Sequence, residues 1–276
     1  MSCKDHPIPP IMVGREYDDA VIGNYMRKKH LALSEFIGKP ETCYLPYTAT
    51  DFRSLIEQIA SIPGAAGLRI YFASYWFTGV PSIDRIVQGG YKEMLTLIYA
   101  ATDAKGIDLG EYYMISPFGG VFPITVAAGN VLVNAYRNFK IPLLVQIMIT
   151  AGKPDFQETR SLWIELDKFT AKNGYLSEME CQQVYGVSAF IGAFPEGYRF
   201  PGMPDYDPTW QMTLVLVFIK PAFYNGTQYL WHFDIEDDPH YEHRKKLAGQ
   251  GQGSGNLKGG DTLNPCPPST NCGKLG

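Results

Sequence analysis

The chain has 276 residues, of which 45% are hydrophobic and 19% are charged, and its formal net charge is -4. This length can build one large domain or two small ones around a sizeable core, and the hydrophobic content excludes a wholly disordered chain. The two densest cationic stretches, 27–29 and 244–246, have acidic residues nearby, so the sequence argues against nucleic-acid binding.

The amino-terminal residues and the cysteines bear on the compartment. Residues 1–10 contain neither the basic start nor the continuous apolar stretch of a signal peptide. The five cysteines are odd in number and scattered, which is a poor disulfide framework. We therefore expect a cytoplasmic protein.

One uncharged segment, 112–136, is long enough to cross a bilayer. Pro117 and Pro123 interrupt its first part, and Asn130 and Asn134 would leave amides unpaired in lipid. We expect a buried segment and no membrane span.

In chain order, the pattern predicts a helix over 15–36 and a second helix that includes Phe52 to Ala60, with Thr50 or Asp51 as its N-cap. In the second helix the apolar residues recur at i, i+3, i+4, i+7 and i+8. The next expected element is a strand, 67–73, whose side chains alternate between two faces. Nearly apolar residues at 94–100 predict a strand for the middle of a sheet.

The second half is expected to contain a helix over 155–172, with Leu162, Trp163, Leu166 and Phe169 inward. The strongest prediction is a C-terminal hairpin of strands 210–219 and 227–235, because Asn-Gly lies between them. No internal repeat is apparent in the sequence.

These elements do not alternate regularly, so we expect an α+β fold with a mixed or mainly antiparallel sheet, its C-terminal hairpin packed against several helices. Residues 1–246 are predicted to form a single domain. Residues 247–276 contain eight glycines and few apolar side chains, so we expect a flexible tail that ends in a cysteine pair, with 261–272 docking on the domain.

A first candidate site follows the hairpin, where histidines and carboxylates gather. His232 and Asp234 alternate along a strand, and His240 and His243 share a face if they lie on a helix. Imidazole and carboxylate groups together can hold a divalent metal such as Zn. The alternative is a charged, solvated turn, because no established zinc spacing is matched.

A second candidate site is the pair Arg69 and Tyr71 on the strand 67–73. A charged residue inside an apolar strand needs a partner or an open face, so Arg69 is a candidate for binding an anionic ligand. The alternative is an arginine on the solvent face whose stem covers apolar neighbours.

The tail holds Cys266 and Cys272 with five residues between them. They could bind a metal or form a disulfide, and the alternative is two reduced thiols. Phosphate-loop, dinucleotide-binding, zinc-protease and nucleophile-elbow motifs are missing from the sequence, so no catalytic residue and no cofactor are predicted.

The strand Gly67-Leu68-Arg69-Ile70-Tyr71-Phe72, the helix before it and the terminal Cys266-Pro267-Pro268…Cys272 resemble a known pattern. It is that of uncharacterised bacterial proteins with a Gly-Leu/Ile-Arg-Ile-Tyr-Phe strand and a short Cys-Pro-Pro-x-Cys tail. This sequence departs by a longer gap between its last two cysteines and by extra material around 118–225. The resemblance implies no known activity, but it implies that strand and tail belong to one unit.

Three functions stay open. The first is a non-enzymatic protein-interaction or self-assembly protein, which the tyrosine-rich composition and the missing catalytic motifs favour. The second is a metal-dependent enzyme that uses the histidine cluster 232–243. The third is a small-ligand binding protein that uses Arg69 and Tyr71.

Overall fold

The computed structural model describes residues 15–172, 174–181, 183–198, 207–219, 221–224, 227–230 and 264–265. The helices are α1 (Arg15–Tyr25), η2 (Met26–His30), α2 (Leu31–Ile37), α3 (Ala49–Ala60), α4 (Pro81–Ile86), η3 (Val87–Tyr91), α5 (Val126–Ala135), η4 (Tyr136–Lys140), α6 (Ile141–Thr150), α7 (Asp167–Thr170) and α8 (Tyr175–Cys181). The strands are β1 (Tyr44–Thr48), β2 (Gly67–Ser74), β3 (Leu95–Thr102), β4 (Asp108–Ile115), β5 (Val121–Ile124), β6 (Ser161–Glu165), β7 (Gly186–Ala193), β8 (Met212–Ile219), β9 (Pro221–Tyr224), β10 (Thr227–Leu230) and β11 (Asn264–Pro265).

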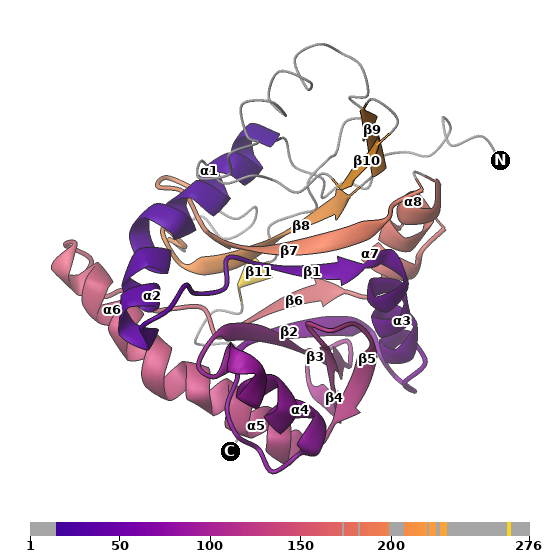
Figure 1. The fold of residues 1–276 in the computed structure, drawn as a ribbon, viewed down its shortest axis with the longest axis horizontal. Coiled ribbons are helices and arrows are strands. Elements are labelled where there is room, and N and C mark those ends of the chain that lie inside the picture. Colours follow the sequence, from indigo (N-terminus) through magenta and orange to yellow (C-terminus); the bar gives the residue numbers. More distant parts are fainter. Residues whose placement is uncertain are drawn as a thin grey trace.

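The strands form two main antiparallel sheets (Figure 1). The larger sheet has the order β11-β6-β2-β3-β4-β5, and the smaller has the order β1-β7-β8. A C-terminal hairpin is present, but its strands are β9 and β10, which form a separate two-stranded sheet. Strand β8, which covers most of the predicted strand 210–219, pairs with β7, and residues 231–235 of the other predicted strand lie outside the described residues. The predicted α+β fold with mainly antiparallel sheets is therefore confirmed.

Helix α3 and strand β2 form where the local pattern predicts them. The Thr48 hydroxyl accepts a hydrogen bond from the Asp51 amide and caps α3, so the helix begins slightly earlier than expected. Its apolar stripe, which includes Phe52 and Ile56, is buried. All eight residues of β2 are buried, because it lies between β6 and β3 in the sheet.

The two faces of β2 contribute to different cores. Leu68, Ile70 and Phe72 belong to the largest core cluster, to which α3 and alternate residues of β7 also contribute. Tyr71 and Ala73 belong to a second cluster under α5. In the smaller sheet, helix α1 covers the outer face of β7 and β8, as α5 covers the outer face of β2.

The structure contains an internal repeat that the sequence analysis missed. We call residues 15–102 the first repeat and residues 126–219 the second repeat. Each begins with a long helical segment that contains a π-helical turn: α1, η2 and α2 in the first, and α5, η4 and α6 in the second. Each segment ends in a Gly-Lys-Pro sequence, at Gly38 and at Gly152, and both glycines have positive φ.

The strands of the two repeats pair in the same register, but they do so across the repeats. In the smaller sheet, Tyr44 of β1 lies opposite Phe190 of β7, and Thr48 lies opposite Gly186. The corresponding pairs in the larger sheet are Ser161 with Tyr71, and Glu165 with Gly67, between β6 and β2. Each repeat thus gives one strand to the sheet of the other.

The pairing within each repeat follows the same rule. Gly67 lies opposite Thr102 between β2 and β3, and Gly186 lies opposite Ile219 between β7 and β8. The two repeats are therefore equivalent in register over all three of their strands, and each depends on the other for a complete sheet.

The predicted helix over 155–172 is wrong. Its residues Leu162 and Trp163 lie in strand β6, and only Asp167–Thr170 is helical. The segment is a strand because it pairs with β2 on one side and with β11 on the other. Asn264 and Pro265 of the tail pair with β6, within the range expected to dock.

Among the described residues, no helix combines the length and the apolar composition that a membrane crossing needs. The uncharged segment 112–136 contains the last part of β4, then β5 and α5, and half of the side chains of α5 are buried. This agrees with the expectation of a buried segment.

Candidate functional site

Arg69 is buried and well paired. Its guanidinium is 2% exposed and donates from Nη1 to Asp108 Oδ1 at 3.0 Å and from Nη2 to the Gly106 carbonyl at 2.6 Å. Gly106 has a φ of 73°, which glycine adopts without strain. The carboxylate of Asp103 accepts hydrogen bonds from two amides of this turn, those of Lys105 and Ile107. The turn thus presents a carbonyl to the guanidinium.

Tyr71 shares the same carboxylate. Its hydroxyl donates to Asp108 Oδ2 at 2.5 Å, and Tyr112 donates to that oxygen at 3.2 Å. Burial, and then the charge of Asp108, raise the pKa of Tyr71 far above its usual value. Arg69 and Tyr71 thus lie on the same side of the strand and both contact Asp108, and their predicted role in binding a ligand stays a prediction.

The second repeat lacks this network. The residues equivalent to Arg69 and Tyr71 are Ser188 and Phe190, as the common strand register shows. Phe190 packs on the ring of Tyr44 at 5.3 Å, in an apolar cluster with α1. The fold therefore does not require an arginine or a tyrosine at these positions.

Arg137 lies near this network and adds a second cation. Its Nε atom is buried and has no hydrogen-bond partner among the described residues. Burial and the charge of Arg160 lower the pKa of Arg137, while Tyr71 and Tyr112 act in the opposite direction. Arg137 is thus a functional candidate that the sequence analysis missed.

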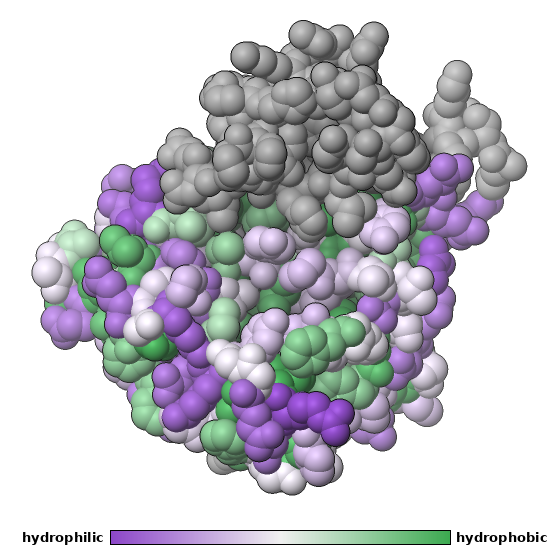
Figure 2. Space-filling view, viewed as in Figure 1, coloured by the Kyte–Doolittle hydropathy of each residue, from purple (hydrophilic) through white to green (hydrophobic). Residues whose placement is uncertain are grey.

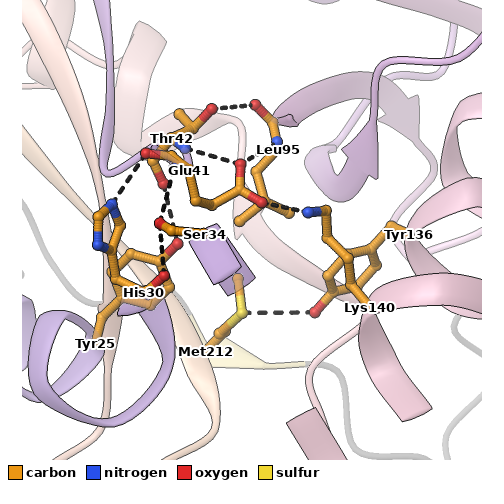
Figure 3. A network of polar contacts seen from close by, with 9 residues as sticks. All are labelled: Tyr25, His30, Ser34, Glu41, Thr42, Leu95, Tyr136, Lys140 and Met212. Carbon is orange, nitrogen blue, oxygen red and sulfur yellow. Dashed lines mark hydrogen bonds and ion pairs between the residues drawn. The ribbon is translucent and has the colours of Figure 1, made fainter. Parts of the chain in front are cut away.

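Two fully buried ion pairs connect the repeats. Lys140 of η4 pairs with Glu41, which precedes β1 (Figure 3). The other oxygen of Glu41, Oε1, accepts from the amides of Thr42 at 2.8 Å and Leu95 at 2.7 Å. The carboxylate is therefore satisfied by one cation and two backbone donors.

The second pair repeats this arrangement. Lys29 of η2 pairs with Glu158, whose Oε1 accepts from the amides of Thr159 at 2.9 Å and Met212 at 2.7 Å. Both pairs are crossed, since each joins a helical segment of one repeat to a glutamate of the other.

A tyrosine completes each arrangement. The hydroxyl of Tyr25 donates to the Thr42 carbonyl at 3.0 Å, and that of Tyr136 donates to the Thr159 carbonyl at 3.0 Å. These contacts are equivalent by position in the two repeats, and the ion pairs they border have no access to solvent. The ion pairs connect the two repeats, and a ligand cannot reach them without opening the core.

The histidine cluster His232, Asp234, His240 and His243 lies outside the described residues, as do Cys266 and Cys272. Within the part of the chain that the structure describes, no group of three or more His, Cys, Asp or Glu side chains could hold a metal ion. The predicted metal site stays a prediction.

An extended uncharged surface runs along α5, η4 and α6. In 126–150 the charged residues are Arg137, which is half-buried, and Lys140, which is buried. We call the exposed residues of this run the uncharged face: Val126, Ala127, Val131, Asn134, Asn138, Phe139, Pro142, Gln146, Ile149 and Thr150. Figure 2 shows hydrophobic residues among hydrophilic ones along the left-hand edge, where α6 lies in Figure 1.

The equivalent helical segment of the first repeat differs at its surface. Helix α2 also exposes apolar side chains, Leu31 and Phe36. These are accompanied by the exposed charged residues Arg27, Lys28 and Glu35. Since the two segments occupy equivalent positions, the fold does not dictate an uncharged surface.

Comparison with known proteins finds no matching family model, no matching curated protein and no matching solved structure. The fold and the surface define a duplicated α+β protein whose repeats exchange strands and differ in one long helical surface.

Proposed function

We propose that this chain is a protein-binding protein and that the uncharged face of α5, η4 and α6 is its docking surface. The observation that carries the proposal is the contrast between the two repeats. The same helical segment exposes charges in the first repeat and none but the half-buried Arg137 in the second. Depletion of charge at a surface patch is typical of the central part of a protein interface.

The exposed side chains have the composition of an interface. Phe139 is 47% exposed and stacks on Trp76, with ring centroids 5.1 Å apart. The ammonium group of Lys92 lies 5.0 Å from the centroid of the same Trp76 ring. Aromatic rings of this kind contribute strongly to binding, because they bury large areas at low entropic cost.

The face is also rigid and long. The buried side chains Leu132, Tyr136 and Leu144 anchor the three helical elements on the core. At a rise of about 1.5 Å per residue, the segment 126–150 is about 37 Å long. A preformed surface of this length loses little conformational entropy on binding.

Site-specific photo-crosslinking in the host cell tests this function. A photoreactive residue replaces Val131 on the uncharged face or, as the matched control, Glu35 on α2. We expect a defined covalent adduct from position 131 that disappears when Phe139→Glu is added, and none from position 35. The absence of an adduct at 131, or equal adducts at both positions, would contradict the proposal.

A further inference from the structure

We infer that the protein has a binding site for a phosphate group between Arg137 of η4 and Arg160, the residue directly before β6. The chain neighbours of these arginines are in contact, since the Tyr136 hydroxyl donates to the Thr159 carbonyl at 3.0 Å. The inference goes beyond the proposed function and does not depend on it, because neither arginine belongs to the uncharged face.

The two arginines form a pair of cations without a counter-ion. Among the described residues, no carboxylate pairs with the side chain of Arg137 or of Arg160, and the buried Nε atom of Arg137 makes no hydrogen bond. Burial and then the charge of Arg160 lower the pKa of Arg137. Two neighbouring cations repel each other, and an anion bound between them would relieve this repulsion.

A buried serine hydroxyl lies beside the arginines. Ser161 follows Arg160 and lies opposite Tyr71 in the pairing of β6 with β2, so Ser161 and Tyr71 project from the same side of the sheet. Ser161 is 1% exposed, and its Oγ atom has no hydrogen-bond partner among the described residues. Helical turn η4 packs on β2, and Tyr71 acts on the charge of Arg137. Buried hydroxyls are normally hydrogen-bonded, and a ligand at this place would satisfy that of Ser161.

The first repeat has apolar side chains at the equivalent positions. Met26 follows Tyr25 as Arg137 follows Tyr136, and Tyr44 pairs with Phe190 as Ser161 pairs with Tyr71. Met26 and Tyr44 pack on the cluster that contains Phe190, and the rings of Tyr44 and Phe190 are 5.3 Å apart. The fold is thus complete there with apolar residues, so it does not require the polar set of the second repeat.

The same comparison shows where a ligand would lie. Ser161 stands where the first repeat has the phenol ring of Tyr44, and a serine side chain is smaller by that whole ring. The phosphate group occupies the volume that this difference releases. Ser161 is closed off from solvent, whereas Arg160 is exposed and Arg137 is half-buried. The ligand therefore enters between the two arginine side chains.

The chemistry of the site selects a phosphate group. A guanidinium group has paired N–H donors that fit two phosphate oxygens, and a serine hydroxyl can donate to a third. A phosphate monoester carries a charge of about -1.5 to -2 at pH 7, which matches two arginines, whereas a carboxylate would leave one of them uncompensated. The carboxylate of Asp108 does not oppose binding, because Arg69 pairs with it and two tyrosine hydroxyls donate to it.

Isothermal titration calorimetry of the purified full chain tests this inference, with inorganic phosphate and phenyl phosphate as probes and acetate as a monoanion, all at one ionic strength. We expect saturable binding of a single phosphate group per chain and no binding of acetate. Arg160→Gln, at an exposed position, should weaken phosphate binding at least about tenfold, because it removes a charge-assisted hydrogen bond. Arg85→Gln, at an exposed position of α4, is the matched control and should leave the affinity unchanged.

The two phosphate probes distinguish the sources of the group. Tighter binding of phenyl phosphate would identify a phosphate ester as the ligand, and tighter binding of inorganic phosphate would identify the free ion. Both results support the site.

Arg137→Met separates binding from folding, because methionine is the residue at the equivalent position of the first repeat. Without phosphate this variant should melt no lower than the wild-type protein, since the substitution removes an uncompensated cation. Phosphate should raise the melting temperature of the wild type and leave that of the variant unchanged. A variant that melts well below the wild type would show that Arg137 serves the fold, and would count against the site.

Three further results would overturn the inference. They are the absence of saturable binding of both phosphate probes, equal binding of acetate, and affinities that Arg160→Gln and Arg137→Met leave unchanged. None of them affects the crosslinking expected from position 131, so a failure of this site and a failure of the proposed function can be told apart.

Discussion

Lys29 and Lys140 illustrate how much depends on single residues in this chain. Each is buried against a glutamate of the other repeat, and neither lysine can reach water as an alternative. Burial lowers the pKa of both lysines, while the neighbouring carboxylates raise it. A lysine in such a place is tolerated only while its partner is present.

Removing one member of a pair should be costly. We predict that Lys29→Met lowers the free energy of unfolding by about 3–5 kcal/mol, because it leaves the Glu158 carboxylate buried without a cation. Lys140→Met should do the same through Glu41, since the two pairs are equivalent. Chemical denaturation measures the free energy of unfolding of both variants.

The control for this prediction is Lys168→Met. Lys168 pairs with Glu165 at 3.7 Å near the surface, and such pairs contribute about 0–1 kcal/mol. A small loss for Lys29→Met, similar to that of the control, would show that the buried pairs do not hold the repeats together.

The buried tyrosines predict how stability depends on pH. Burial raises the pKa of Tyr25, Tyr47, Tyr99 and Tyr136 in the folded protein. Below pH 10 these hydroxyls are protonated in both the folded and the unfolded protein, so they contribute fully to the free energy of unfolding. Above pH 10 the unfolded chain ionises first, and stability falls by up to about 1.4 kcal/mol per pH unit for each tyrosine.

Two lysines oppose this trend. Folding lowers the pKa values of Lys29 and Lys140. Their contribution to the free energy of unfolding therefore rises with pH, up to the pKa of a lysine in the unfolded chain. The tyrosines outnumber them, so we expect net destabilisation above pH 10. Denaturation curves between pH 8 and 11, with phenolate absorbance recorded in parallel, check this. Ionisation of every tyrosine near pH 10 while the protein stays folded would contradict it.

Among the elements, the sequence identifies those with a strong local signal. Helix α3 follows from its apolar stripe, and β2 follows from its alternating pattern. Strand β6 could not be found in this way, because the spacing of Leu162, Leu166 and Phe169 also fits a helix. What makes the segment a strand is its pairing with β2, far away in the sequence.

The candidate site was predictable only where a local signal exists. Arg69 stands out as a charged residue in an apolar strand, but its partner Asp108 is on β4 and no local pattern connects them. The repeat had a sequence signal that could have revealed it. Gly-Lys-Pro occurs at 38–40 and at 152–154, and a Glu-Thr pair follows each, at 41–42 and at 158–159.

Gly129 determines how closely α5 approaches the sheet. A Cβ atom at this position would lie 2.2 Å from the ring of Tyr112. We predict that Gly129→Ala destabilises the fold by about 1–3 kcal/mol through overpacking, although alanine favours helix. Gly89→Ala is the control, since its Cβ would lie 3.7 Å from Phe118. Thermal unfolding compares the two variants, and equal melting temperatures would contradict the packing.

At the scale of the whole molecule, the repeat explains both the architecture and the asymmetry. Strand exchange and the crossed ion pairs make the repeats dependent on each other, so the surface is where they are free to differ. They do differ there: one helical segment exposes charges and the other does not. On this account, the second repeat provides the binding surface and the first repeat completes its support.

Hydroxyl-radical footprinting of the full chain, purified and in an extract of the host cell, tests this account most directly. Phe139 on the uncharged face and Phe36 on α2 are a matched pair, because the same side chain is 47% and 52% exposed at the two positions. We predict that oxidation of Phe139 relative to that of Phe36 is lower in the extract than in the purified protein, because a bound partner covers the uncharged face. Protection of Phe36 with Phe139 still oxidised would contradict the central claim that the uncharged face is the binding surface.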